Sequence, residues 1–168
     1  MEENKSKVLA LKYRPQIFSD LIGQELTAET IINSIKLNRV PNAYLFTGIR
    51  GVGKTTIARI VAKALNCDNG VEKLCKDRMC NNCISIANSN HIDVLEMDAA
   101  SKTGVDDVRE LIEFSKYSPS TSKFKIFIID EVHMLSKQAF NALLKTLEEP
   151  PPHLKFIFAT TEIRKIPV

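Results

Sequence analysis

The sequence lacks any apolar run that approaches the length of a membrane span, and its first residues, Met1–Lys7, place no apolar stretch behind a basic start. We therefore expect a cytoplasmic protein with no membrane partner. A strong charge of one sign is also missing, because 23 basic residues are balanced by 20 acidic ones to leave +3. Charge alone therefore does not indicate nucleic-acid binding. Internal repeats and low-complexity tracts are absent as well.

The length of 168 residues and the hydrophobic fraction of 44% fit one domain with a real core. Short apolar or alternating runs, typical of strands, alternate with stripes of helical spacing. This alternation predicts an α/β fold with a central parallel sheet covered by helices on both faces. The expected strands are 43–47, 92–97, 124–129 and 155–160, and the expected helices include 31–35, 56–65, 105–112 and 140–147.

A phosphate-binding motif lies between the first expected strand and the helix that follows. Residues 48–55 read G-x-x-x-x-G-K-T, which is a P-loop in its required strand, loop and helix setting. The alternative, an ordinary glycine-rich turn, is disfavoured by that setting. Lys54 is expected to reach the β- and γ-phosphates of a nucleoside triphosphate, and Thr55 to ligate Mg²⁺. The expected nucleotide-binding residues here are Gly48, Ile49, Arg50, Gly51, Val52, Gly53, Lys54, Thr55 and Thr56.

Two carboxylates follow the apolar strand 124–129, at the edge of a parallel sheet where ligands collect. Asp130 is expected to hold Mg²⁺ with Thr55, and Glu131 to polarise the attacking water, since adjacent strand residues point in different directions. An idle, solvated pair of acids is the alternative. His133 invites comparison with a DEAH-type helicase, although a histidine packed near the site explains it as well.

A pair of threonines ends the last expected strand. One hydroxyl of Thr160 and Thr161 is positioned to bond the γ-phosphate or the attacking water, and an ordinary pair of strand-end threonines is the alternative.

All four cysteines fall within residues 67–83, in a polar segment. Four thiolates suit a tetrahedral Zn²⁺ with no open position, so such a zinc would be structural and would brace a small insertion. Four unligated cysteines are the alternative. The expected ligands are Cys67, Cys75, Cys80 and Cys83.

Together, these motifs resemble the gamma/tau ATPase family of bacterial DNA polymerase III clamp loaders over essentially the whole chain. The telling stretches are 11–18, 48–56, 97–101, 129–135 and 141–151. The resemblance implies an AAA+ ATPase domain, a three-layer sandwich with a small inserted zinc module. It also implies ATP, Mg²⁺ and Zn²⁺ as cofactors. The implied partners are other clamp-loader subunits, the sliding clamp and primer–template DNA.

The resemblance assigns further residues. Those that match positions around the adenine are Tyr13, Arg14, Pro15, Ile22 and Gly23. Thr161 matches the sensor of the γ-phosphate, and Lys102 a basic position that faces DNA, with a solvated surface lysine as its alternative. Relatives carry a four-cysteine zinc module at this place. Here four residues rather than two separate the second and third cysteines, so Cys75 is the least expected ligand.

The sequence stops before the family's Ser-Arg-Cys arginine finger, lid and collar. We therefore expect one ATPase domain over residues 1–168, with the zinc insertion at 67–83 and weak hydrolysis in isolation. A catalytically weak nucleotide-binding module is the second hypothesis. A DEAH-type helicase core, the third, would need a second motor domain for which the chain is too short. No residues indicate polymerase chemistry.

Overall fold

The computed structural model describes residues 13–71, 75, 78–102 and 104–166. Leu11 and Lys12 of the stretch 11–18, five residues of the insertion at 67–83, and Pro167 and Val168 lie outside this part. The strands are β1 (Ala43–Thr47), β2 (Val94–Asp98), β3 (Lys125–Asp130) and β4 (Leu154–Thr160). The α-helices are α2 (Glu25–Lys36), α3 (Lys54–Asn66), α4 (Asn81–Ala87), α5 (Val105–Ser115) and α6 (Lys137–Glu148). Three short 3-10 helices are η1 (Phe18–Asp20), η2 (Val132–Met134) and η3 (Ile163–Lys165).

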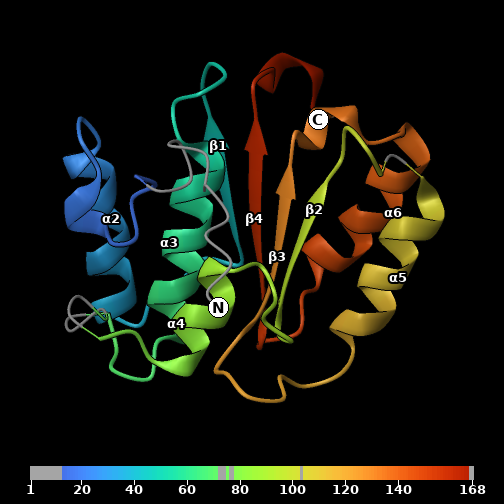
Figure 1. Cartoon of the computed structure of the whole chain (residues 1–168). Coiled ribbons are helices and arrows are strands. Elements are labelled where there is room, and N and C mark those ends of the chain that lie inside the picture. The colour runs from blue at the N-terminus through green and yellow to red at the C-terminus, as the bar shows by residue number, and fades with distance from the viewer. Residues whose placement is uncertain (1–12, 72–74, 76–77, 103, 167–168) are drawn as a thin grey trace, which may run out of the picture.

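The four strands form one parallel sheet in the order β1-β4-β3-β2, which confirms the predicted α/β class (Figure 1). Strand β4 is buried along its whole length, and β3 is buried up to Asp130. Such continuous apolar runs are typical of central parallel strands. Because the strands are parallel, the carboxyl ends of β1, β4 and β3 lie side by side at one edge of the sheet.

Helices cover both faces of the sheet, as the alternation of elements predicts. Alternate residues of β3 point to opposite faces, so Ile126 and Ile128 pack in one core and Phe127 and Ile129 in the other. The first core includes residues of α2 and α3, and the second includes residues of α5 and α6 (Figure 1). The predicted apolar face of α3 is buried, with Ile57, Ile60, Val61, Ala64 and Leu65 each at most 5% exposed.

Several elements differ from the sequence expectation; for example, α2 begins at Glu25 rather than at Ile31. The strand expected at 92–97 begins at Val94, because Ile92 and Asp93 form a turn. Helix α4 lies in the cysteine segment, where no helix is expected. Its N-cap is Cys80, whose Sγ accepts a hydrogen bond from Cys83 N–H at 3.5 Å, a capping role usually taken by Ser, Thr, Asp or Asn.

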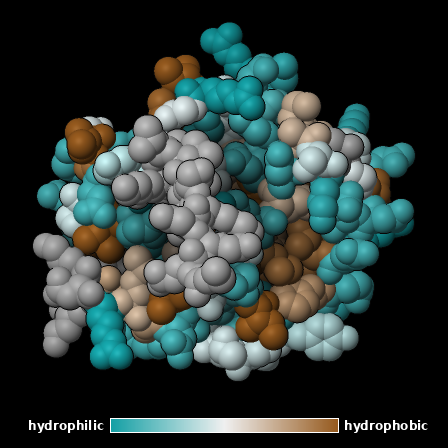
Figure 2. Space-filling view, viewed as in Figure 1, coloured by the Kyte–Doolittle hydropathy of each residue, from teal (hydrophilic) through white to brown (hydrophobic). Residues whose placement is uncertain are grey.

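The surface mixes hydrophilic and hydrophobic residues over the face drawn in Figure 2. No helix in the described ranges is long and apolar enough to cross a membrane.

A fully buried carboxylate fixes the loop that leads into β3. Asp93 accepts hydrogen bonds from the backbone N–H groups of Ser120, Thr121 and Ser122 at 2.8, 2.8 and 3.1 Å, and from the hydroxyls of Thr121 and Ser122. Burial alone raises the pKa of Asp93, but these hydrogen bonds outweigh it and hold the pKa below its ordinary value.

We therefore expect Asp93→Asn to destabilise the fold by about 3 kcal/mol at pH 7, because it places a hydrogen-bonding NH₂ group among several donors. The pKa of the Asp93 carboxyl is lower in the folded protein than in the unfolded chain, where it is roughly 3.9. The ionised carboxylate therefore stabilises the fold above that unfolded pKa, and this stabilisation is lost as the pH falls through the folded pKa. Urea unfolding of the wild type and of Asp93→Asn from pH 7 to pH 3 measures the difference in their free energies of unfolding. This difference should become smaller toward pH 3.

The matched control is Asp106→Asn, whose side chain is 94% exposed and pairs with Arg109. It should change stability by less than about 1 kcal/mol. Equal effects of the two substitutions would contradict a special role for Asp93.

Candidate functional site

The P-loop occupies residues 48–53, between the end of β1 and the start of α3. Gly51 and Gly53 have φ angles of +86° and +88°, in the left-handed region where a side chain would be strained. Gly53 is the N-cap of α3, so the loop leads directly into the helix N-terminus. This arrangement presents backbone N–H groups and the positive end of the helix dipole, which together favour anions.

The first two residues of α3 carry the polar side chains of the loop. Lys54 is 7% exposed, and its Nζ donates to the carbonyl oxygens of Gly48 and Ile49 at 3.0 Å each. The hydroxyl of Thr55 donates a short hydrogen bond to Asp130 Oδ2. The two residues expected to share Mg²⁺ are therefore in direct contact across 75 positions of sequence.

Asp130 and Glu131 point different ways, but not because of strand alternation as the sequence reasoning assumed. Glu131 lies beyond β3 and adopts a left-handed conformation with φ 50° and ψ 44°. Its N–H donates to Asp130 Oδ1 at 2.9 Å. The turn in the backbone therefore directs Asp130 to Thr55 and Glu131 toward the end of β4.

Thr161 and His133 surround the Glu131 carboxylate. Thr161 donates to Glu131 Oε2 from its N–H at 3.2 Å and from its hydroxyl at 3.0 Å. His133, with a side chain 6% exposed, places Nδ1 at 3.4 Å from the same oxygen and at 2.8 Å from Thr160 Oγ1. The two threonines are thus distinguished by geometry, since Thr160 is fully buried and bonded to His133.

A cavity of about 710 Å³ opens along this edge of the sheet. Most of the predicted site residues line it: Tyr13, Arg14, Pro15, Ile22, Arg50, Gly51, Val52, Gly53, Lys54, Thr55, Thr56, Asp130 and Glu131. Four others do not line it. The carbonyls of Gly48 and Ile49, in the P-loop itself, accept from Lys54. Thr161 hydrogen-bonds the Glu131 carboxylate, and Gly23 has a left-handed backbone conformation with φ +76°.

The cavity also contains residues that the sequence reasoning did not place there: Leu21, Gln24, Asp98 and Ala100. Gln24 Nε2 donates to the carbonyl of Val52 at 3.3 Å and so joins the N-terminal segment to the P-loop. Asp98 is paired in register with Asp130 at the ends of β2 and β3. A signal for Asp98 is present in the sequence, because it directly follows the predicted strand 92–97 on the same sheet edge. Nothing in the sequence marks Gln24.

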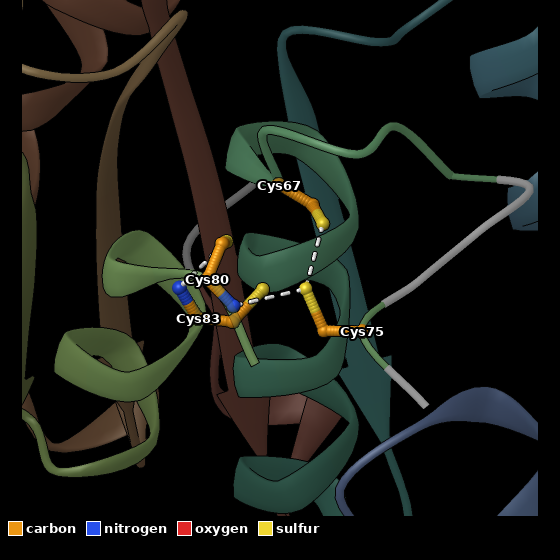
Figure 3. A group of neighbouring side chains, drawn as sticks. All are labelled: Cys67, Cys75, Cys80 and Cys83. Atoms are coloured by element: carbon orange, nitrogen blue, oxygen red, sulfur yellow. Dashed lines mark hydrogen bonds between the residues drawn. The ribbon is translucent and has the colours of Figure 1, made fainter. Parts of the chain in front are cut away.

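The four cysteine sulfurs lie within 4.8 Å of one another (Figure 3). Cys67 caps the C-terminus of α3, and Cys80 and Cys83 begin α4. Cys75 faces them, with its Sγ at 3.4 Å from that of Cys67 and accepting from Cys80 N–H at 3.2 Å. Cys75, the least expected ligand, therefore belongs to the cluster geometrically.

The pKa values of the thiols in the cluster are shifted in opposite directions. Burial raises the pKa of Cys83 and of Cys67. Burial also acts on Cys75, but hydrogen bonds from Cys80, Cys67 and Asn69 outweigh it and lower its pKa to about 7. A tetrahedral zinc with Zn–S bonds of about 2.3 Å separates its sulfurs by roughly 3.8 Å. The donor set and spacing therefore fit Zn²⁺, with backbone N–H groups supporting the thiolates.

A family model described as "DNA polymerase III, delta subunit" matches residues 23–167. The chain is 55% identical over 161 residues to DNA polymerase III subunit gamma of Buchnera aphidicola subsp. Baizongia pistaciae, covering 95% of this chain and 43% of the relative. It is 52% identical over 162 residues to DNA polymerase III subunit tau of Escherichia coli, covering 96% and 25%. The chain thus spans less than half the length of these relatives.

Among solved structures, the RuvB Holliday junction branch migration motor of Thermotoga maritima resembles the fold with a TM-score of 0.61. The sequence identity is 18%, and the match covers 92% of this chain and 44% of RuvB. At that identity the likeness concerns the fold alone. It supports the predicted arrangement of a parallel sheet between helices.

The contact between His133 and Thr160 yields a prediction. We expect His133→Ala to destabilise the protein by about 2 kcal/mol, because the buried Thr160 hydroxyl keeps only the hydrogen bond that it accepts from Glu162 N–H and loses its side-chain partner. His133→Asn, whose amide places a polar atom near the position of Nδ1, should cost less. Urea unfolding at pH 7.5 compares the two variants with the wild type, and equal losses for Ala and Asn would contradict the hydrogen-bonding role.

Proposed function

Since this chain belongs to the DNA polymerase III delta-subunit family and matches the N-terminal region of gamma and tau subunits, we propose that it is an ATP-binding and ATP-hydrolysing domain of a clamp loader. In this proposal it serves to load the sliding clamp onto primed DNA during replication. The proposal combines two kinds of support: the likeness to replication subunits and the chemistry of the site.

The observation that carries the proposal is the direct contact of Thr55 with Asp130. A hydroxyl at the first turn of a P-loop helix and a carboxylate at a neighbouring strand end are hard oxygen ligands of the type that Mg²⁺ takes beside nucleotide phosphates. Both groups line the cavity of about 710 Å³, together with Lys54.

Different residues around the cavity would bind different parts of the nucleotide. In our proposal the P-loop N–H groups and the α3 N-terminus hold phosphate oxygens, and Lys54 turns from its carbonyl partners toward the β- and γ-phosphates. A Mg²⁺ ion bound with ATP would neutralise phosphate charge, with Thr55 and Asp130 as its protein ligands. Tyr13, Arg14, Pro15 and Ile22 form the side of the cavity assigned to the adenine.

Glu131 is the proposed base for hydrolysis. Its Oε2 is fixed by the two hydrogen bonds from Thr161. A carboxylate held in one orientation can accept a proton from a water aligned with the γ-phosphorus. Because Thr161 is the predicted sensor of the γ-phosphate, its bond to Glu131 would link phosphate sensing to placement of the base.

The partners in this proposal are other clamp-loader subunits, the sliding clamp and primer–template DNA. They come from the likeness to gamma and tau subunits, which are components of DNA polymerase III. Lys102 is solvent-exposed after the turn at Asp98, which suits a contact with the DNA backbone.

We assign the cysteine cluster to a structural Zn²⁺. Four sulfur ligands leave no open position for water, so the ion would brace the segment that joins α3 to α4. Cys83 is 1% exposed and Cys75 is 5% exposed, whereas Cys67 and Cys80 are partly exposed, so one side of the cluster is closed to solvent.

We predict that Glu131→Gln retains ATP binding and loses hydrolysis, by a factor on the order of 10² to 10⁴, because the amide cannot accept the proton. Nucleotide affinity is measured with a fluorescent ATP analogue, and turnover by phosphate release with partner subunits and primed DNA present. The control is Glu113→Gln, on the exposed side of α5 in an ion pair with Lys116. Unchanged hydrolysis in Glu131→Gln would overturn the assignment of the base.

We also predict about one zinc per chain in protein purified without chelators, determined by elemental analysis. Cys75→Ser should lower that content strongly, whereas Ser85→Ala, on α4 but outside the cluster, should leave it unchanged. A wild-type content well below one per chain would refute the four-cysteine site.

A further inference from the structure

A buried histidine lies against the proposed base for hydrolysis. His133 belongs to η2, the short 3-10 helix that begins directly after Glu131. Its neighbours Val132 and Leu135 are buried in the core that includes residues of α5 and α6, so the backbone that carries His133 is anchored on both sides. The His133 side chain is itself only 6% exposed. The ring is therefore held among protein groups rather than in water.

The partners of the His133 ring connect the end of β3 to the end of β4. Its Nδ1 lies 2.8 Å from Thr160 Oγ1 and 3.4 Å from Glu131 Oε2. Thr160 is fully buried and pairs in register with Thr47, the residue that directly precedes the P-loop. One ring nitrogen thus links the proposed base to the strand that lies beside the P-loop strand.

The surroundings of Nδ1 favour a proton on this nitrogen. An unprotonated Nδ1 would direct its lone pair at the negative charge of Glu131, whereas an Nδ1–H group is attracted to that charge. Thr160 Oγ1 accepts a hydrogen bond from Glu162 N–H at 3.0 Å, and a hydroxyl oxygen has a second lone pair with which to accept another. The geometry therefore fits an Nδ1–H donor shared between Thr160 Oγ1 and Glu131 Oε2.

The contacts of the Glu131 side chain all reach the same oxygen. Thr161 donates to Oε2 from its N–H and from its hydroxyl, and His133 Nδ1 faces Oε2 as well. Within the part of the chain that the structure describes, no hydrogen bond to Oε1 accompanies them. An anchored Oε2 leaves Oε1 to accept a proton from water, and the direction of Oε1 then depends on the groups that hold Oε2.

We propose that His133 is a positioning residue for ATP hydrolysis: its Nδ1–H, braced by Thr160, holds Glu131 Oε2 so that Oε1 faces the attacking water. The inference rests on the proposed function, because it takes Glu131 as the base. In the step that it serves, the water oxygen forms a bond to the γ-phosphorus, the bond from that phosphorus to the bridging oxygen of ADP breaks, and Oε1 takes the proton of the water.

The location of His133 predicts which kinetic quantity it affects. Its side chain does not line the cavity of about 710 Å³, so it has no contact with nucleotide in this scheme. Loss of the Nδ1–H group should therefore slow the chemical step and leave nucleotide affinity unchanged.

The first test locates the proton in nucleotide-free protein. The chain has three histidines, so the ¹⁵N imidazole signals of His133 are assigned by their loss in His133→Asn. We expect Nδ1 of His133 to be protonated in the wild type at pH 8. A ring protonated on Nε2 alone would overturn the proposal, and this result does not depend on the folding of any variant at position 133.

The second test compares two side chains of the same branched shape. His133→Leu removes the donor, whereas His133→Asn keeps an amide N–H near the position of Nδ1. The rate constant is measured in single turnovers of prebound ATP, with partner subunits and primed DNA present, so that it does not depend on the fraction of folded protein.

We expect His133→Leu to lower this rate constant about tenfold and to change the affinity for a fluorescent ATP analogue less than about twofold. His133→Asn should restore the rate to within about threefold of the wild type. The control is His153→Leu, which removes a histidine at the opposite end of β4, where Nε2 lies 3.0 Å from the carbonyl oxygen of Ser115. Its rate should equal that of the wild type.

A double-mutant cycle shows whether His133 acts through Glu131. In the Glu131→Gln background, His133→Leu should cause no further loss of rate, because the base that it positions is already absent. The same tenfold loss in both backgrounds would overturn the proposal, since His133 would then act independently of Glu131.

The outcomes distinguish this inference from the function on which it rests. If the wild type hydrolyses ATP and Glu131→Gln does not, but His133→Leu is as fast as the wild type or His133→Asn is as slow as His133→Leu, the positioning role is wrong and the proposed function stands. If the wild type binds no ATP, or if Glu131→Gln is fully active, the proposed function or its base fails and the inference fails with it.

Discussion

The hydrogen bond from Thr55 to Asp130 depends on the order of the strands, and so does the rest of the site. Thr55 follows β1 and Asp130 ends β3, and the two strands are separated in the sheet by β4. The side chains therefore meet across the end of β4, where Thr160 and Thr161 lie. Because β4 is buried on all sides, any shift of its register would move the threonines, Glu131 and the P-loop relative to one another.

Much of this arrangement follows from local patterns in the sequence. The apolar runs and the stripe at Ile57, Ile60 and Val61 predict the strands and the faces that they bury, because period and burial are linked by simple geometry. The glycine pattern of the P-loop is equally direct, since few other residues tolerate the backbone angles found at Gly51 and Gly53. These features depend on neighbours in the chain, so a single sequence can reveal them.

The features that sequence reasoning missed depend on contacts between distant segments. Gln24 reaches Val52 across 28 positions, and nothing in its own neighbourhood indicates a partner in the P-loop. Helix α4 has polar residues and a cysteine at its N-cap, so its sequence pattern resembles that of a loop. Its position beside Cys67 follows from the clustering of the four sulfurs. Tertiary contacts override weak local preferences in such short elements.

The conformation of Glu131 shows why the proposed base could be identified but not oriented in advance. A non-glycine residue in the left-handed region costs about 1 kcal/mol or more, so surrounding contacts must offset that cost. Here the offsetting contacts are the hydrogen bond from Glu131 N–H to Asp130 and the two from Thr161 to the carboxylate. Each joins the strained residue to another part of the same site. The strain is therefore sustained by the groups that we assign to Mg²⁺ and γ-phosphate, and a ligand that draws Thr161 or Asp130 away would act directly on the placement of Glu131.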